Sequence, residues 1–293
     1  MTSTVRSEIK VIANQRQAVI AEGPDAEMFL QGQLSQDVTA LAPGEASWSL
    51  VLHPQGKISA WFRITRRSDD RFVLDLDHGW ADEVLTRLNR FKLRTKIEIT
   101  EAPWNSLTIV GPGADDIAVQ GVEHDMIGSW AGVPVRDVFG PDLDAASLNL
   151  PVLDLAAFTA LRIEAGVPKM GRELDESTIP AAAGIVEQSV SFTKGCYTGQ
   201  ELVARIDSRG NNVPKRLLSV VLPVESSSAD GVELMADGES IGTLTSASYS
   251  AHLEAMVGLA YIGRALDPGQ SVTAELDGVT VTGELRELPL VRG

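Results

Sequence analysis

The sequence contains a single cysteine, Cys196, among its 293 residues. One cysteine excludes an internal disulfide, a site with four thiolate ligands and a redox pair of the CxxC type. A metal cluster on this chain would therefore need ligands from another molecule. Low cysteine content is also typical of proteins in a reducing compartment, so we expect a cytoplasmic location.

The chain also lacks long apolar runs and targeting signals. No stretch approaches the roughly eighteen uninterrupted apolar residues that a membrane-spanning helix needs. The N-terminal sequence MTSTVRSEIK has no apolar core and contains an acidic residue. These features argue against a secretory signal or an Arg-rich transit peptide, and we expect no membrane partner.

The chain also has few basic residues, and its histidines lack the spacing typical of metal ligands. Twenty-five Lys and Arg residues against forty Asp and Glu residues give a formal net charge of −15. This balance argues against a surface wholly devoted to nucleic acid. The histidines have no ligand-like spacing, so we expect surface or turn roles for them and no bound metal. They are His53, His78, His124 and His252.

The hydrophobic pattern mixes helices with strands over the first two thirds of the chain, and the length predicts about two domains. Apolar spacing indicates helices near 26–34, 80–93, 114–119 and 155–165, the last closed by Gly166. Alternation indicates strands at 15–20 and 97–109, and a meander at 47–76.

Turn formers at 140–153 indicate a subdomain boundary. After Pro214 the pattern is all-β, with Asp277-Gly278 at a tight hairpin turn. We therefore expect a small C-terminal barrel or sandwich.

The segment with the most information is KGCYTGQE, residues 194–201. Thr198 and Glu201 have the spacing of a capping box, which predicts a helix over about 199–208 that Gly210 closes in a left-handed conformation. Glu201 has two readings, a reciprocal cap of that helix or a ligand-binding carboxylate, and both roles are difficult to fill at once.

Cys196 also has two readings. It precedes a predicted helix N-terminus and lies two residues from Lys194, and both features favour a reactive thiolate. The alternative is a small buried side chain, which is common for free cysteine. Gly195 and Gly199 flank this region, and two glycines at this spacing indicate a tight turn or the close approach of a flat ligand.

KGCYTGQE resembles the signature of the YgfZ family of folate-binding proteins, a branch of the superfamily that includes the aminomethyltransferase of the glycine cleavage system. Further segments support the resemblance: FLQGQLSQDV at 29–38, HPQGKISAWFRI at 53–64, LRIEAGVPKMGREL at 161–174 and VPKRLL at 213–218. The resemblance implies an α+β, GcvT-like fold with two interwoven subdomains and a C-terminal antiparallel β-barrel around a central folate channel. The corresponding domains are 1–213, with its internal boundary near 140–153, and 214–293.

Tetrahydrofolate, or a one-carbon derivative, is the cofactor that the resemblance implies. Its pterin edge needs bidentate polar groups, its rings need apolar walls and its glutamate tail needs a cation. Suited side chains are Gln200 or Glu201 for the edge, Tyr197 and Trp61 for the walls, and Arg205 or Arg216 for the tail. Asp37 lies where the superfamily has an aspartate near the folate, although a helix-ending acid is the alternative.

The chain departs from the aminomethyltransferase pattern at two places. Ser59, Ala60 and Trp61 stand where the transferases carry an aspartate pair, so the acid–base group of the transfer reaction is missing there. Ala182 stands where they carry a glutamate, a contact that Glu187 or Glu201 could replace.

The resemblance and these departures lead to three functional hypotheses. The first is a folate-binding accessory factor that assists iron–sulfur cluster assembly or repair in client enzymes, with Cys196 and Lys194 as its reactive pair and a link to tRNA modification. The second is an aminomethyltransferase, and the third is a non-enzymatic folate-responsive scaffold.

A basic cluster near the motif leaves several partners open. Its residues fit a solvated helix end, an anion site for a folate tail, or contacts with tRNA phosphates. They are Arg205, Arg209, Lys215 and Arg216.

Overall fold

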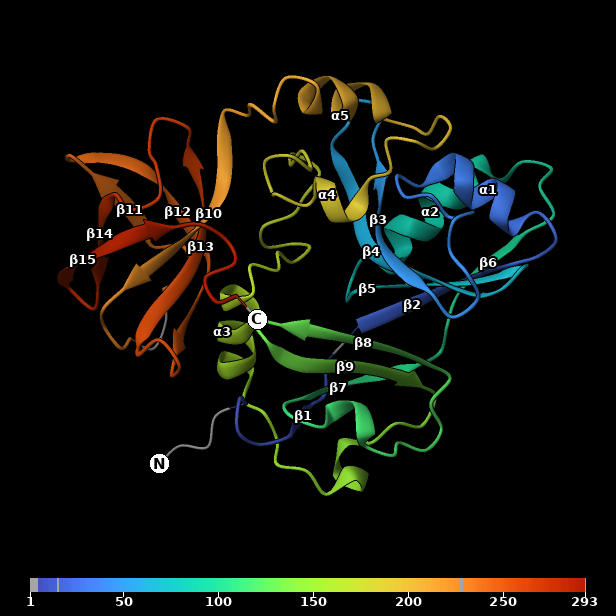
Figure 1. Cartoon of the computed structure of the whole chain (residues 1–293), viewed down its shortest axis with the longest axis horizontal. Coiled ribbons are helices and arrows are strands. Elements are labelled where there is room, and N and C mark those ends of the chain that lie inside the picture. Colours follow the sequence, from blue (N-terminus) through green and yellow to red (C-terminus); the bar gives the residue numbers. More distant parts are fainter. Residues whose placement is uncertain (1–4, 15, 227–228, 293) are drawn as a thin grey trace. The chain divides into compact units, whose positions relative to one another are not determined.

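The computed structural model describes residues 5–14, 16–226 and 229–292. Its contacts divide the chain into two compact units, each assembled from separate stretches of sequence. Unit 1 consists of Met1–Asn14, Ser106–Glu173 and Pro214–Gly293, and unit 2 of Gln15–Asn105 and Leu174–Val213. The chain therefore passes between the two units several times (Figure 1). The domain limits near 140–153 and at 213 stay predictions.

Unit 2 is built on a five-stranded sheet in the order β3-β4-β5-β2-β6 with antiparallel pairing. Its strands are β2 (Arg16–Glu22), β3 (Ala46–Leu52), β4 (Ile58–Ser68), β5 (Arg71–Asp77) and β6 (Glu98–Glu101). The predicted meander is confirmed as β3, β4 and β5. Gly56 lies in the turn between β3 and β4 with a φ of +69°, a value that favours glycine.

Two amphipathic helices, α1 (Ala26–Gln33) and α2 (Ala81–Lys92), pack on this sheet (Figure 1). Their apolar faces contribute Leu30 and Leu88 to a core that also contains Phe62 and Phe72 of the sheet, all fully buried. Unit 2 also contains the short helices α4 (Val186–Ser189) and α5 (Gln200–Asp207). The spacing of apolar residues at three and four positions thus predicts α1 and α2 correctly.

Unit 1 contains a four-stranded sheet in the order β1-β7-β9-β8 and the helix α3. The elements are β1 (Lys10–Ile12), β7 (Asn105–Val110), β8 (His124–Trp130), β9 (Val133–Gly140) and α3 (Leu155–Glu164). Gly166 follows α3 with a φ of +70°, as the sequence predicts for a helix end.

The C-terminal part of unit 1 is a closed antiparallel barrel in the order β10-β13-β12-β11-β14-β15. Its strands are β10 (Lys215–Leu222), β11 (Glu233–Ala236), β12 (Glu239–Ser250), β13 (Ala255–Gly263), β14 (Ser271–Leu276) and β15 (Val279–Arg286). Asp277 and Gly278 both have positive φ between β14 and β15, which confirms the predicted hairpin turn. The all-β prediction after Pro214 is also confirmed.

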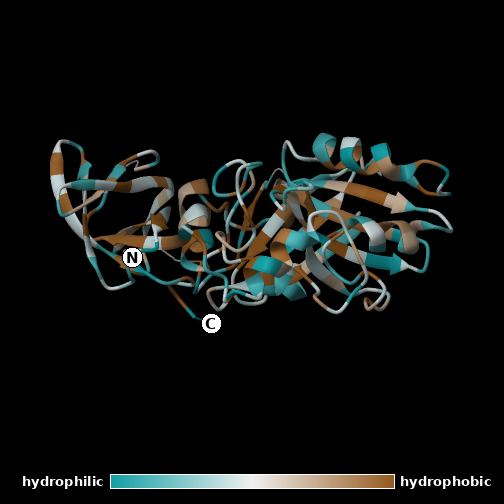
Figure 2. Cartoon of the chain, turned by 90° about the horizontal axis from the view of Figure 1, so that it is seen from above, coloured by the Kyte–Doolittle hydropathy of each residue, from teal (hydrophilic) through white to brown (hydrophobic). Residues whose placement is uncertain are grey.

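The predicted helix over 114–119 is wrong. Only Ala114–Asp116 form a helical turn, the 3₁₀ turn η1, which begins after the left-handed Gly113 and ends at the extended Ile117. A second 3₁₀ turn, η2, spans Ala145–Leu148. Among the helices of residues 5–14, 16–226 and 229–292, none has the length and apolar character needed to cross a bilayer. Figure 2 shows the apolar stretches mainly on strands and polar residues on many connecting loops.

Candidate functional site

Lys194 joins the KGCYTGQE motif to the end of α1 within unit 2. Its Nζ donates hydrogen bonds to the carbonyl oxygens of Gln31 and Leu34, both at 2.6 Å, and of Gln36, at 3.0 Å. Carbonyls at a helix C-terminus lack partners within the helix, and an ammonium group satisfies them well. Two segments identified separately in the sequence, 29–38 and 194–201, are thus held together by one side chain.

The three bonds occupy the three N–H donors of Lys194. Burial lowers the pKa of Lys194 to about 8, against the nearby charge of Asp37, which raises it. The geometry therefore makes Lys194 a positioning residue for the motif. Direct assistance of Cys196 by Lys194 stays a prediction.

Ser35 fixes the stretch that leads into the motif. It is fully buried, and its Oγ donates to the carbonyl oxygen of Ser189 at 2.6 Å and accepts from the backbone N–H of Leu50 at 2.9 Å. Its own carbonyl accepts from the N–H of Ser191 at 3.0 Å. One serine thus connects the end of α1, strand β3 and the segment before Lys194.

Gly199 begins helix α5 in a left-handed conformation, with a φ of +83°. A Cβ at this position would lie 2.6 Å from the carbonyl oxygen of His53 and 2.9 Å from the Cβ of Leu52. Position 199 therefore requires glycine for two reasons, the positive φ and the close packing on the turn after β3.

The predicted capping box of Thr198 and Glu201 is wrong, because the helix-capping residue is Gly199 and makes no side-chain cap. Instead, Oε1 of Gln200 accepts from the backbone N–H of Tyr197 at 3.2 Å. The predicted helix itself is confirmed as α5, and Gly210 follows it with a φ of +72°.

Cys196 is exposed. The reading of Cys196 as a small buried side chain is therefore wrong, and its sulfur is accessible to a reaction partner. Gly195 beside it is also exposed, its φ is not positive, and a Cβ added there would meet no atom within 4 Å. The fold gives no reason for glycine at 195, in contrast to 199.

Three further predicted site residues lie on the same segment. Tyr197 is buried, and burial raises the pKa of its phenol to about 12, so its hydroxyl stays protonated at neutral pH. Glu201 and Arg205 are exposed on α5, and neither side chain forms an ion pair with another residue of the described chain. These side chains retain their capacity to bind a ligand.

Trp61 lies in a different environment from the exposed residues of α5. Only 3% of its surface is exposed, its ring stacks on Trp48 with centroids 3.8 Å apart, and its Nε1 donates to Oγ of Ser189 at 2.9 Å. Its indole N–H and one of its faces are thus already occupied by the protein.

Two other predicted residues make specific contacts. Asp37 accepts hydrogen bonds from Oγ1 of Thr39 at 2.7 Å and Nε2 of Gln31 at 2.9 Å, and its pKa is lowered, chiefly by the bond from Thr39. Arg216 belongs to unit 1 and pairs with Asp267 at 2.9 Å. Their roles in binding stay predictions.

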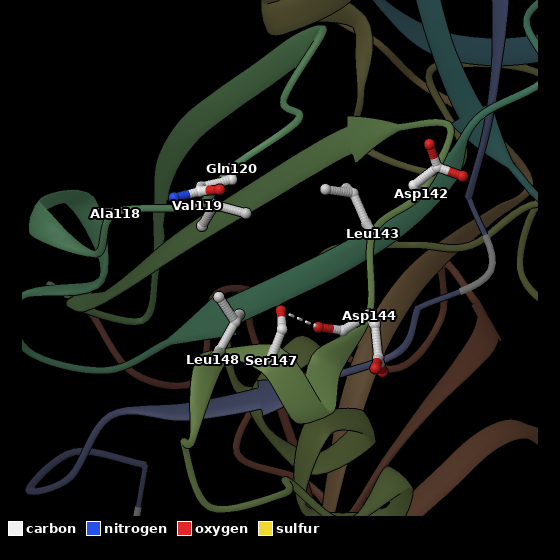
Figure 3. Close-up of a pocket in the computed structure, with 8 residues that line it drawn as sticks. All are labelled: Ala118, Val119, Gln120, Asp142, Leu143, Asp144, Ser147 and Leu148. Atoms are coloured by element: carbon white, nitrogen blue, oxygen red, sulfur yellow. Dashed lines mark hydrogen bonds between the residues drawn. The ribbon is translucent and has the colours of Figure 1, made fainter.

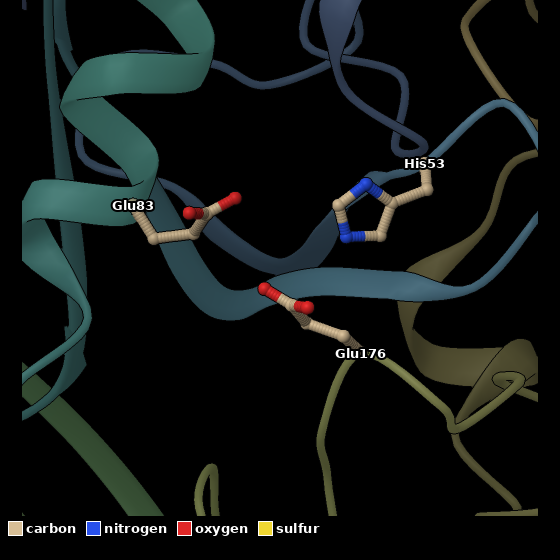
Figure 4. A group of neighbouring side chains, drawn as sticks. All are labelled: His53, Glu83 and Glu176. Atoms are coloured by element: carbon tan, nitrogen blue, oxygen red, sulfur yellow. The ribbon is translucent and has the colours of Figure 1, made fainter.

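Three side chains that are distant in the sequence lie close together in unit 2. His53, Glu83 and Glu176 place one ligand atom each within 4.8 Å of one another (Figure 4). The Oγ of Ser59 donates to Oε1 of Glu83 at 2.5 Å, so the position that lacks the transferase carboxylate has a carboxylate from α2 beside it. His53 is the first residue of the HPQGK turn, and the sequence pattern does not link it to Glu83 or Glu176.

A separate cavity of about 440 Å³ lies in unit 1 (Figure 3). Its polar lining includes Gln120, Asp142 and Asp144, and Oγ of Ser147 donates to the carbonyl oxygen of Asp144 at 2.6 Å. None of the predicted site residues lines this cavity.

Comparisons with known proteins agree with the motif and the fold. Residues 4–131 match the model of the GCVT N-terminal domain, and residues 215–291 match that of the glycine cleavage T-protein C-terminal barrel domain. The solved aminomethyltransferase T of the glycine cleavage system from Bartonella henselae superposes with a TM-score of 0.84, over 98% of this chain and 88% of that one. At 21% identity this match shows the fold, and the predicted GcvT-like fold class is confirmed.

Relatives found by sequence have a higher identity to this chain than that solved structure has. An uncharacterized protein of Haemophilus influenzae is 30% identical over 242 residues, which cover 80% of this chain and 82% of that protein. The tRNA-modifying protein YgfZ of Edwardsiella ictaluri is 31% identical over 214 residues, 65% of this chain and 64% of its own. The mitochondrial iron–sulfur cluster assembly factor IBA57 homolog of Phaeosphaeria nodorum is 28% identical over 227 residues, 70% of this chain and 53% of its own.

The matches thus span less than two thirds of the length of these YgfZ and cluster-assembly relatives. They nevertheless agree with the two domain models and with the KGCYTGQE motif. The chain is a YgfZ-like member of the GcvT-like superfamily.

Proposed function

We propose that this protein is a cytoplasmic, tetrahydrofolate-binding factor that assists the assembly or repair of iron–sulfur clusters in client enzymes. Relatives named for tRNA modification and for iron–sulfur cluster assembly support this function. The observation that carries it is the exposure of Cys196, the only cysteine of the chain, inside the KGCYTGQE motif. The link to tRNA modification then runs through client enzymes that contain clusters.

The chemistry of the motif segment fits a reduced folate. Glu201 offers a free carboxylate for the donor edge of a pterin, and Arg205 offers a free cation for the anionic tail. The phenol of Tyr197, with its pKa near 12, offers a neutral hydroxyl beside an aromatic face. A bound tetrahydrofolate would supply a carrier for one-carbon units.

Cys196 and Lys194 have separate roles in the proposed function. Cys196 presents a sulfur that can bind or exchange with a cluster, which is the substrate here. Lys194 holds the segment against the end of α1 through its three carbonyl acceptors. One thiolate does not hold a cluster alone, so the client enzyme or an assembly protein supplies the remaining ligands.

A deletion strain tests this function. Plasmids carrying the wild-type gene, Cys196→Ala and the neighbouring exposed control Thr193→Ala are compared by the activity of a cluster-containing enzyme in cell extracts. Wild type and Thr193→Ala should restore that activity, whereas Cys196→Ala should accumulate as a folded protein and fail to restore it. Full restoration by Cys196→Ala would refute the role of the thiol.

An aminomethyltransferase is the second candidate, because Glu83 places a carboxylate beside Ser59, where the transferases carry theirs. An assay with an aminomethylated lipoyl carrier and tetrahydrofolate tests it. Turnover that Glu83→Gln abolishes would favour this candidate over the accessory factor. The third hypothesis, a folate-responsive scaffold, treats Cys196 as a packed side chain without a chemical role, and the exposure of Cys196 argues against it.

A further inference from the structure

His53, Glu83 and Glu176 come from three different elements of unit 2. His53 lies in the turn between β3 and β4, Glu83 in the first turn of α2, and Glu176 in the loop that follows Leu174. Figure 4 shows the imidazole ring and the two carboxylates directed toward a common space. Their ligand atoms all lie within 4.8 Å of one another, although the residues are distant in the sequence.

These groups converge without bonding to one another. His53 forms no ion pair with either glutamate in the described part of the chain, and its Nε2 atom is buried without a hydrogen-bond partner there. A buried ring nitrogen without a partner costs free energy, and so does the approach of two carboxylates. A cation between the three side chains would offset both costs.

Each side chain is held in place by the protein. Ser59, itself fully buried on β4, donates to Oε1 of Glu83 at 2.5 Å and leaves the second carboxylate oxygen available. A hydrogen-bonded neighbour of this kind orients a metal ligand. The turn of His53 is closed by hydrogen bonds from its N–H to the carbonyl of Lys57, at 2.9 Å, and from the N–H of Gly56 to its carbonyl, at 2.8 Å.

The loop of Glu176 is fixed on both sides of this residue. Oδ1 of Asp175 accepts hydrogen bonds from the N–H and Oγ of Ser177, at 2.8 and 2.6 Å, and from Oγ1 of Thr178, at 2.8 Å. The carbonyl of Thr178 accepts from the N–H of Ile58 at the start of β4, at 2.9 Å. The loop is thus tied to the same strand that carries Ser59.

We propose that His53, Glu83 and Glu176 bind a first-row divalent transition-metal cation, such as Zn²⁺ or Mn²⁺. One imidazole nitrogen and two carboxylates form a mixed ligand set that such ions accept, whereas Ca²⁺ and Mg²⁺ prefer oxygen ligands alone. Three protein ligands leave a coordination position for water or a substrate atom. The site depends on neither folate nor Cys196, so it stands apart from the proposed function.

Metal binding to the purified full-length chain tests the proposal. All proteins carry Cys196→Ala, which removes the thiol as a competing ligand, and are stripped with a chelator before calorimetric titration with Zn²⁺, Mn²⁺ and Mg²⁺. We expect one Zn²⁺ or Mn²⁺ per chain. Glu176→Gln, Glu83→Gln and His53→Gln should each weaken binding by roughly tenfold or more, because each removes a ligand.

Matched controls are the exposed residues His78 and Glu187 of the same unit. His78→Gln and Glu187→Gln should bind the metal as the parent does. Since Glu176 is exposed, Glu176→Gln is expected to keep the fold, which circular dichroism verifies. The proposal is overturned if the parent binds no transition metal, if control and site variants bind alike, or if Mg²⁺ binds as tightly as Zn²⁺.

Cobalt provides a second readout. Co²⁺ bound to the parent should show visible absorption bands that change when His53→Gln removes the nitrogen ligand. Bands that are identical in the parent and in His53→Gln would place the ion elsewhere and contradict the site.

Discussion

Gly199 of the KGCYTGQE motif packs so closely on His53 that an added Cβ would lie 2.6 Å from the His53 carbonyl oxygen. The start of α5 and the turn after β3 therefore share one tightly packed contact. Cys196, three residues before Gly199, and His53, a ligand of the proposed cation site, are carried by segments that meet there. A change at Gly199 should therefore affect both the motif and that turn.

Substitution of the two glycines of the motif should reduce stability by very different amounts. Gly199→Ala forces a side chain into a left-handed conformation and against backbone atoms, so we expect a loss of about 2–4 kcal/mol in the free energy of unfolding. Gly195→Ala has open space and should change it by less than about 0.5 kcal/mol. Urea unfolding of both variants measures the difference, and equal losses would contradict the assigned packing.

Gly195→Ala also separates stability from function. Because the fold does not require glycine there, a stable Gly195→Ala variant that fails to support client enzymes would indicate that a ligand or partner approaches the backbone at 195. Full support by this variant would show that the exposed face at Gly195 is dispensable.

Lys194 should make the stability of the protein depend on pH in the alkaline range. Its pKa is about 8 in the folded protein, against 10.5 for an unperturbed lysine side chain. The unfolded chain therefore holds the proton more tightly. The free energy of unfolding should therefore rise with pH between these values, and this contribution is lost as the pH falls through about 8.

The matched variant for this prediction is Lys194→Met. The difference in unfolding free energy between wild type and Lys194→Met should be larger at pH 9.5 than at pH 7.5, as urea unfolding at both values measures. A difference that stays constant or shrinks would contradict the lowered pKa.

Ser189→Ala should destabilise unit 2. The substitution leaves the buried Nε1 of Trp61 without an acceptor, which costs about 1–3 kcal/mol. The control is Ser191→Ala, which should cost less than about 0.5 kcal/mol, because within the described part of the chain its hydroxyl shares one exposed hydrogen bond, with Oγ1 of Thr193. Thermal unfolding followed by tryptophan fluorescence compares the two, and equal melting temperatures would contradict the role of the Trp61 bond.

Much of this architecture could be predicted from the sequence, because local patterns determine it. The spacing of apolar residues identifies α1 and α2, alternation identifies the meander, and Asp277-Gly278 identifies a hairpin. The KGCYTGQE motif identifies the family because its eight residues are highly specific. Local signals also misled: Thr198 and Glu201 have capping-box spacing, but the left-handed Gly199 already begins the helix.

The group of His53, Glu83 and Glu176 could not be predicted, since its members lie on a turn, a helix and a distant loop. Spacing along the chain carries no information about residues that only the tertiary fold brings together. Trp61 illustrates the same limit: its residue type suits a ligand wall, but its stacking on Trp48 and its bond to Ser189 depend on packing.

Calorimetric titration of the purified protein with tetrahydrofolate measures folate binding itself. We expect binding at one site, weakened about tenfold or more by Glu201→Gln and by Arg205→Met, because hydrogen bonds to charged groups contribute about 1.5–3 kcal/mol each. Arg90→Met, an exposed control on α2 of the same unit, should bind as wild type does. No binding, or equal binding by all four proteins, would contradict a folate site at Glu201 and Arg205.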